Sequence, residues 1–156
     1  MANAFAGLIK GLSAHLRVQL EIEDESTVHV SFDGIPLILE HLLEAEQILL
    51  AAPIVDMPAE GGDALCRELL KGHYLFAGTR GATLALDADE NFVCLQIAPS
   101  MRALTPENFP ALVENFLNVA ETWRERLQTG LPAEGAREKT AEPAAPPQLM
   151  AGFRKA

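Results

Sequence analysis

The sequence has few cysteines and no long apolar run. Its two cysteines, Cys66 and Cys94, lie far apart in a chain of 156 residues, which excludes a disulfide framework and a zinc-ligand spacing. No apolar stretch reaches the ~20 residues that a membrane-spanning helix requires. The N-terminal segment also lacks the basic start and long apolar core of a signal peptide. These absences predict a protein of the reducing cytoplasm that does not insert into a membrane.

Basic residues are scarce as well. The chain has 12 Lys and Arg against 22 Asp and Glu, for a formal net charge of -10. The excess of acidic residues lies before Gly130, where the chain has eight basic and nineteen acidic residues. Such a surface repels a phosphate backbone, and no basic stripe offsets the repulsion. We therefore expect no binding to DNA or RNA.

Residue types used in catalysis and metal binding do not occur in recognisable patterns. No two of the four histidines lie three or four positions apart, so there is no local pair of metal ligands. No serine or cysteine lies in a G-x-S-x-G turn of the kind that presents a nucleophile. A Ser–His–Asp triad stays open because its members need not be near in sequence, but nothing supports one. We predict no enzyme, no cofactor and no metal site.

The first half of the chain predicts one helix and three strands. Apolar residues recur at helical spacing over residues 4–17, as in an amphipathic helix. Residues 27–32 alternate like a half-buried strand, and Asp33-Gly34 is typical of a hairpin turn. In the next two segments, residues 35–43 and 47–58, apolar side chains occupy both faces, with Ile54 and Val55 placed on opposite sides. Strands of this kind must be covered on both faces, so we expect a second subunit or a bound peptide on the face that helices leave free.

The second half predicts a helix, two strands and a final helix. Residues 61–77 have a helical pattern with Asp63 as N-cap, and residues 82–98 read as two strands joined by the turn DADEN. The last helix spans residues 105–127, with Thr105 as N-cap and Asn108 in place of the usual capping-box glutamate. The fold class is therefore α+β, in the order α-β-β-β-α-β-β-α, with an antiparallel sheet packed by helices. Residues 130–156 are rich in Ala, Pro and charge without periodicity, which predicts a disordered tail.

The stretch GTRGATLALDADEN, residues 78–91, contains two patterns that resemble binding sites. Asp87, Asp89 and Asn91 match the first ligands of a calcium loop, but Phe92 and Ala98 stand where that loop needs Gly and Glu. The segment GTRG lacks the glycine spacing and the following helix of a phosphate-binding loop. We favour structural roles for both: a polar turn between strands, and a helix stop with Gly78 as left-handed cap.

The chain resembles the class I type III secretion chaperones, the Tir-chaperone family. The resemblance is carried by the paired leucines Leu69-Leu70, the glycine turn at Gly78 and Gly81, the strands TLALD and VCLQ, and the apolar pattern of the last helix. It covers residues 1 to about 129 and is looser in the first half. The resemblance implies a homodimer that binds the N-terminal region of a secreted effector in extended form and keeps it soluble and competent for secretion.

The resemblance also implies which surfaces are used. The dimer interface is expected on the second helix and the strand after it, at Leu65, Leu69, Leu70, Tyr74, Leu84 and Leu86. The effector is expected on the first helix and the sheet surface, at Phe5, Leu8, Leu12, Ile38, Leu49 and Val55. Both sets compete with the simpler interpretation that the residues belong to the core of the single chain. A YbjN-like regulatory or adaptor domain of the same architecture, without an effector client, is the alternative function.

Overall fold

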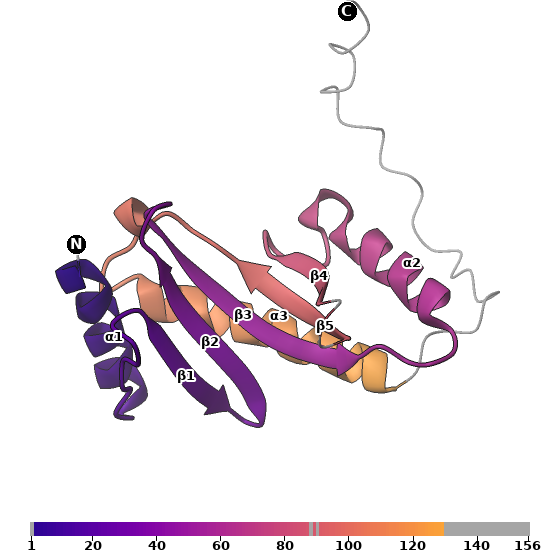
Figure 1. Ribbon diagram of the computed structural model, residues 1–156, viewed down its shortest axis with the longest axis horizontal. Coiled ribbons are helices and arrows are strands. Elements are labelled where there is room, and N and C mark those ends of the chain that lie inside the picture. The colour runs from indigo at the N-terminus through magenta and orange to yellow at the C-terminus, as the bar shows by residue number, and fades with distance from the viewer. Residues whose placement is uncertain (1, 88, 90, 130–156) are drawn as a thin grey trace, which may run out of the picture.

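The computed structural model describes residues 2–87, 89 and 91–129 (Figure 1). The expected tail from Gly130 onward lies outside these residues. The elements follow the predicted order: α1 (Ala2–Leu16), β1 (Thr27–Phe32), β2 (Ile35–Leu42), β3 (Gln47–Asp56), α2 (Gly62–His73), the short helix η1 (Tyr74–Phe76), β4 (Thr83–Asp87), β5 (Phe92–Ile97), the short helix η2 (Met101–Ala103) and α3 (Phe109–Gln128).

The five strands form one sheet in the order β1-β2-β3-β5-β4, with every neighbouring pair antiparallel. This confirms the α+β prediction. Helix α3 runs along one face of the sheet and contacts β3 and β2, and α1 contacts α3 (Figure 1). Helix α2 lies at the far end of the sheet, against β4. Within the described residues, the helices thus cover one sheet face and leave the other face without a helix layer.

The predicted hairpin turn joins β1 to β2. Asp33 and Gly34 both have positive φ, 49° and 78°, as a two-residue turn of type I′ requires. The turn sets Phe32 opposite Ile35 and fixes the register of the whole pair. Arg124 of α3 donates a hydrogen bond of 2.7 Å to the carbonyl oxygen of Gly34, so the turn is also attached to the helix layer.

The core lies between the sheet and the helix layer. The predicted stripe of α1 is buried there, with Phe5, Leu8, Ile9 and Leu12 inaccessible to solvent. The imidazole of His41, on the covered face of β2, stacks on the Phe5 ring at 5.4 Å between centroids. Helix α3 contributes most of the predicted face and a few neighbours: Phe109, Pro110, Val113, Phe116, Val119, Ala120 and Trp123.

A β-bulge in β3 corrects one predicted orientation. Pro53 pairs with Cys94, and the next pair is Val55 with Val93, so two residues of β3 oppose one of β5 at this point. Pro53 has no N–H to give to the ladder, and proline within a sheet is confined to edges and bulges. The extra residue places Val55 on the same side as Ile54, where it packs against the core. The prediction that these two residues face opposite sides was wrong.

Both ends of α2 also differ from the prediction. Gly61, not Asp63, is the N-cap residue, and Asp63 lies in the first turn, where its charge suits the helix dipole. The helix ends at His73, so Tyr74 and Phe76 belong to η1, where Leu75 and Phe76 have positive φ. Gly78 is not a left-handed cap, because its φ is not among the positive values.

The start of α3 corrects the prediction: Asn108, not Thr105, is the N-cap residue, although the two predicted residues do bond each other. The Asn108 side chain accepts a hydrogen bond of 2.8 Å from the Thr105 N–H, and the Thr105 hydroxyl accepts one of 3.3 Å from the Asn108 N–H. The two bonds have the reciprocal pattern of a capping box, but both residues precede the helix. The box closes a turn over residues 105–108, and the helix itself begins at Phe109 with Asn108 as its N-cap residue.

Candidate functional site

The sheet face opposite the helices carries an apolar hollow. Alternate residues of β2 and β3 point to this side and are half-buried, among them Ile38, Leu49, Ala51 and Pro53. The hollow has a volume of about 420 Å³ and is lined by Ile38, Ala51, Pro53, Ala85, Leu86, Asp87, Phe92, Cys94 and Gln96. We call these lining residues, without Leu86, and together with Leu49 the open sheet face; Leu86 pairs with the buried Val93 and so belongs by alternation to the other side of β4. It is a broad, mostly apolar surface with few polar atoms that a ligand could bond.

A second apolar surface lies at α2 and η1. Leu70, Tyr74 and Leu75 expose 71%, 66% and 67% of their surface, and Phe76 exposes about half. We call these four residues the α2 patch. Leu86 of β4, the strand that α2 contacts, is also half exposed. A single exposed leucine is ordinary, but four large apolar side chains within seven positions form an exposed apolar patch, a feature that is rare on the surface of a soluble monomer.

The residues predicted for dimerisation divide into two groups. Leu65 and Leu69 are buried within the single chain, and Leu84 is partly buried against the same core. Leu70, Tyr74 and Leu86 are exposed. The apolar character of the first group is accounted for by the chain's own core, whereas the second group has no such explanation within the described residues.

The residues predicted for effector binding divide in the same way. Phe5, Leu8 and Leu12 are buried beneath α1, and Val55 packs on the core because of the bulge. Ile38 and Leu49 lie on the open sheet face, half-buried. Of the six, only these last two present side chains on a surface that another molecule can reach in the single chain.

Among the large apolar side chains of these surfaces, three were not predicted: Leu75, Phe76 and Phe92. For Leu75 and Phe76 the sequence signal is the run YLF directly after Gly72-His73. Three consecutive large apolar residues point in three directions on a helix, so they cannot all face the core. For Phe92, which lines the hollow, the sequence signal is its position in the alternating segment FVCLQ, and in the structure it pairs with Asp56 and Asp87. Strand alternation places it on the side away from the buried Val93 and Leu95.

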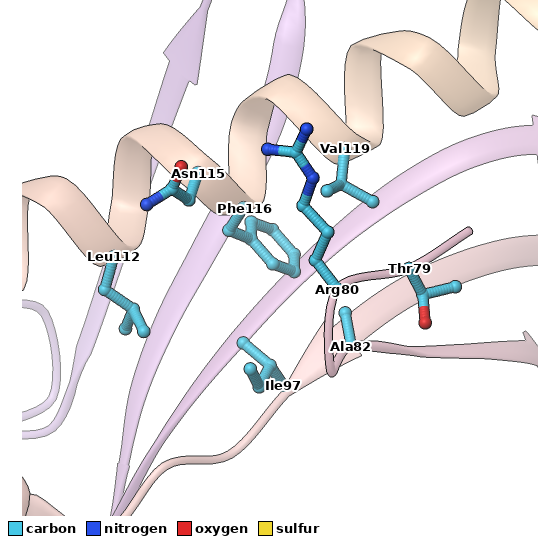
Figure 2. A pocket seen from close by; sticks show the side chains of 8 residues that line it. All are labelled: Thr79, Arg80, Ala82, Ile97, Leu112, Asn115, Phe116 and Val119. Atoms are coloured by element: carbon cyan, nitrogen blue, oxygen red, sulfur yellow. The ribbon is translucent and has the colours of Figure 1, made fainter. Parts of the chain in front are cut away.

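The segment GTRG does not form an anion site. Its backbone N–H groups are used within the turn: Gly78 bonds the Gly72 carbonyl at 3.0 Å, and Thr79 and Arg80 both bond the Phe76 carbonyl. The cavity beside it, shown in Figure 2, has a volume of about 50 Å³ and is mainly apolar, with the Arg80 side chain extending along Phe116 and Val119 of α3. Ligand pockets are several times larger, and the sequence-based preference for a structural turn fits this geometry.

The turn between β4 and β5 is organised by its own side chains. The Asp87 carboxylate accepts a hydrogen bond of 3.1 Å from the Asp89 N–H, and Asn91 has a φ of 57°, as Asx turns and left-handed positions favour. Among residues 2–87, 89 and 91–129, no group of three or more His, Cys, Asp or Glu is arranged to hold a metal ion.

Ionic contacts join α2 to the end of α3. The Glu68 carboxylate pairs with Lys71 at 2.7 Å and with Arg126 of α3 at 3.0 Å. The hydrogen bond from Lys71 lowers the pKa of the Glu68 carboxyl below its usual value; partial burial opposes this, and the charges of Lys71 and Arg126 lower it further.

On the open sheet face, burial raises the pKa of the Cys94 thiol, which keeps it protonated and unreactive at neutral pH.

Comparison with known proteins identifies a family. Residues 7–124 match the model of the Tir chaperone protein (CesT) family. Comparison with curated proteins finds no match in sequence. No described helix of this chain is long and apolar enough to cross a membrane.

Several solved structures share the fold. The structure of the HopA1-SchA chaperone-effector complex matches with a TM-score of 0.65 at 21% identity, covering 80% of this chain and 95% of that chain. The ExsC-ExsE complex matches with a TM-score of 0.64 at 24% identity, covering 76% and 89%. The Yersinia pestis type III secretion chaperone SycH, in complex with a fragment of YscM2, matches with a TM-score of 0.60 at 12% identity, covering 76% and 98%.

Proposed function

The chain belongs to the Tir chaperone protein (CesT) family, and we propose that it is a type III secretion chaperone that binds the N-terminal region of a secreted effector. The protein holds this region in an extended, soluble form until export. One neighbour named as a chaperone-effector complex and another named as a type III secretion chaperone support this function over a YbjN-like regulatory domain without a client. The observation that carries the proposal is the apolar sheet face that none of the described helices covers.

The open sheet face suits an unfolded client. An extended peptide can place alternate side chains in the hollow beside Ile38 and Ala51, and it can add main-chain hydrogen bonds along a sheet edge. The sheet has two such edges, β1 and β4. The hollow offers shape and apolar contact but few polar groups, which fits a chaperone that recognises an apolar segment rather than one small molecule.

The α2 patch is the proposed dimer interface. Dimerisation is typical of the family, and this patch is the most exposed apolar group in the described chain. Burying large side chains such as Leu70 and Tyr74 against their symmetry copies removes apolar surface from water at about 25 cal/mol per Å². A two-fold axis through this surface would bring the same residues from both subunits together.

The function needs no catalysis, and we propose that the protein is not an enzyme and acts in the bacterial cytoplasm. Binding and release of an effector require only surfaces of suitable shape and charge. The excess of acidic residues keeps a protein with apolar patches from associating with itself nonspecifically.

Co-expression tests the proposal. Each candidate secreted protein is produced with and without the chaperone, as full-length chain and without its N-terminal region. We expect one otherwise insoluble partner to become soluble and to co-purify, and to lose both properties when its N-terminal region is removed. Recovery of free chaperone alone with every candidate would contradict the effector-binding function.

A further inference from the structure

We propose that Trp123 is the positioning residue of the dimer interface: its indole, seated between Gly72 and Gly78, sets the orientation of α2 and so which leucines reach the partner subunit. This inference rests on the dimer proposed above. Trp123 is the only tryptophan of the chain, lies on α3 and is 2% exposed. It touches α2 and the segment after η1 from a different layer of the fold.

The two glycines leave the space that the indole fills. A Cβ atom built on Gly72 would overlap the Cη2 and Cζ2 atoms of Trp123. A Cβ on Gly78 would lie 3.3 Å from Cζ2 and 2.8 Å from the Gly72 carbonyl oxygen. Gly72 lies inside a helix and Gly78 has no positive φ, so backbone conformation does not require glycine at either position. At Gly72 the close approach of the tryptophan ring does, and at Gly78 the closest obstacle is the Gly72 carbonyl oxygen, with the ring next to it.

Polar contacts fix the ring in one orientation. Its Nε1–H donates a hydrogen bond of 2.9 Å to the Gly78 carbonyl oxygen. Gly78 in turn donates its N–H to the Gly72 carbonyl at 3.0 Å, which ties the two glycines to each other beneath the ring. A buried indole N–H needs a partner, and only this placement of the α2 end supplies the Gly78 carbonyl.

Arg126 makes a further contact with the indole ring and connects it to α2. The Arg126 guanidinium lies over Trp123 at 5.0 Å from the ring centroid and also pairs with Glu68 of α2 at 3.0 Å. A cation over the face of a tryptophan is attracted to the ring. The contact therefore links the ring, α3 and the middle of α2, and it restrains rotation of α2 about its own axis.

Rotation of α2 decides what the dimer partner meets. Leu65, Leu69 and Gly72 follow one another at i, i+4 and i+7, so they share the helix face that packs inward. Leu70 and Tyr74 lie four positions apart on another side and are exposed. Gly72, which contacts the Trp123 ring, is thus part of the inward face of α2. Displacing the indole would turn or shift α2 and move Leu70 and Tyr74 out of register with the partner subunit.

The test uses Gly72→Ala, Trp123→Phe and the double variant, with Gly7→Ala as matched control. No atom lies within 4 Å of a Cβ at Gly7, and alanine is the better helix former at both glycines. The full-length proteins are compared by circular dichroism, by tryptophan emission where Trp123 is kept, and by the dimer dissociation constant from sedimentation.

We expect Gly7→Ala to match wild type and Gly72→Ala to keep its helical signal, with red-shifted emission and a dimer weakened roughly tenfold or more. Phenylalanine lacks the distant ring atoms that would overlap the new methyl group of Gly72→Ala. The double variant should therefore dimerise within about threefold of Trp123→Phe alone, a recovery that loss of general stability would not produce.

Wild-type emission and wild-type dimerisation in Gly72→Ala would overturn the inference. So would a Gly72→Ala defect, including failure to fold, that Trp123→Phe does not relieve. A wild-type protein that is monomeric at every concentration would instead contradict the proposed homodimer, a result read from the wild-type sample alone.

Discussion

Leu69 and Leu70 are neighbours in α2, yet Leu69 is 8% exposed and Leu70 is 71% exposed. The 100° step between successive helical residues sends the first side chain into the core and the second to the surface. This pair shows the two roles that an apolar residue can have in this fold. One leucine holds α2 to its own chain, and the other is available to a second chain.

We predict that Leu70→Asp gives a folded monomer. An aspartate in an apolar interface is left without a partner for its charge, which weakens the dimer on the order of 100-fold or more. Light scattering after gel filtration, with circular dichroism, measures mass and fold together. The matched control is Leu43→Asp, an equally polar change at an exposed leucine of the β2–β3 turn. A Leu70→Asp dimer as tight as the control would place the interface elsewhere.

Leu69→Asp should behave differently from Leu70→Asp. Its carboxylate would enter the core of the single chain, where removing a buried leucine alone costs about 2–5 kcal/mol. We expect loss of helical signal or aggregation rather than a clean monomer, measured by the same gel filtration and circular dichroism. A well-folded Leu69→Asp monomer would show that Leu69 belongs to the interface more than to the core.

Ile38→Asp is predicted to separate effector binding from folding and dimerisation. Its side chain lines the open sheet face, so a charge there should leave the dimer mass and melting temperature close to wild type. Co-purification of the effector should fall by roughly tenfold, the loss expected when a well-packed apolar contact becomes polar. Leu43→Asp again serves as control, and full effector recovery with Ile38→Asp would argue against this face as the binding surface.

Asn108→Ala should lower stability without affecting partner binding. It removes the acceptor of the Thr105 N–H and the donor to the Ala103 carbonyl in the turn that leads into α3, and loss of such hydrogen bonds costs about 1 kcal/mol. Urea unfolding at one fixed protein concentration measures this. Asn115→Ala, inside the same helix, is the control and should be neutral or stabilising because alanine is the better helix former. Equal effects of the two variants would contradict the role of Asn108 in stabilising this turn.

The Glu68 carboxylate predicts a pH-dependent part of the stability. Because its pKa is lowered in the folded chain, its contribution is present above the unfolded-state pKa and is lost as the pH falls through the folded-state pKa. Wild type should therefore melt above Glu68→Gln at pH 7, and the difference should shrink toward pH 3. Thermal unfolding across this range measures it. A difference that stays constant or grows with acidity would contradict the ionic role.

The architecture was predictable because period and turn chemistry agree along the chain. Helical spacing in residues 4–17, strand alternation after Thr27 and the Asp33-Gly34 turn each specify one local structure, and together they order all eight main elements. The α2 end was not predictable in the same way. Gly72 is explained by a tryptophan on another helix, and the residue spacing within α2 does not reveal that contact.

The candidate surfaces were only partly predictable for the same reason. Apolar residues in the core and in an interface have similar composition, so Leu8 and Leu70 look alike in the sequence. Burial then depends on which face another element covers. The bulge at Pro53 shows how one residue moves Val55 from the expected open side to the core, a change of face that strand alternation alone does not reveal.

The central claim, an effector-binding homodimeric chaperone, is tested most directly by the mass of its purified complex. The chaperone is co-expressed with the secreted protein whose solubility depends on it, and the complex is measured by native mass spectrometry. The account predicts two chaperone chains bound to one effector through its N-terminal region, with the effector lost in Ile38→Asp and the dimer lost in Leu70→Asp. A soluble effector that never associates with the chaperone, or a complex unchanged by either substitution, would contradict it.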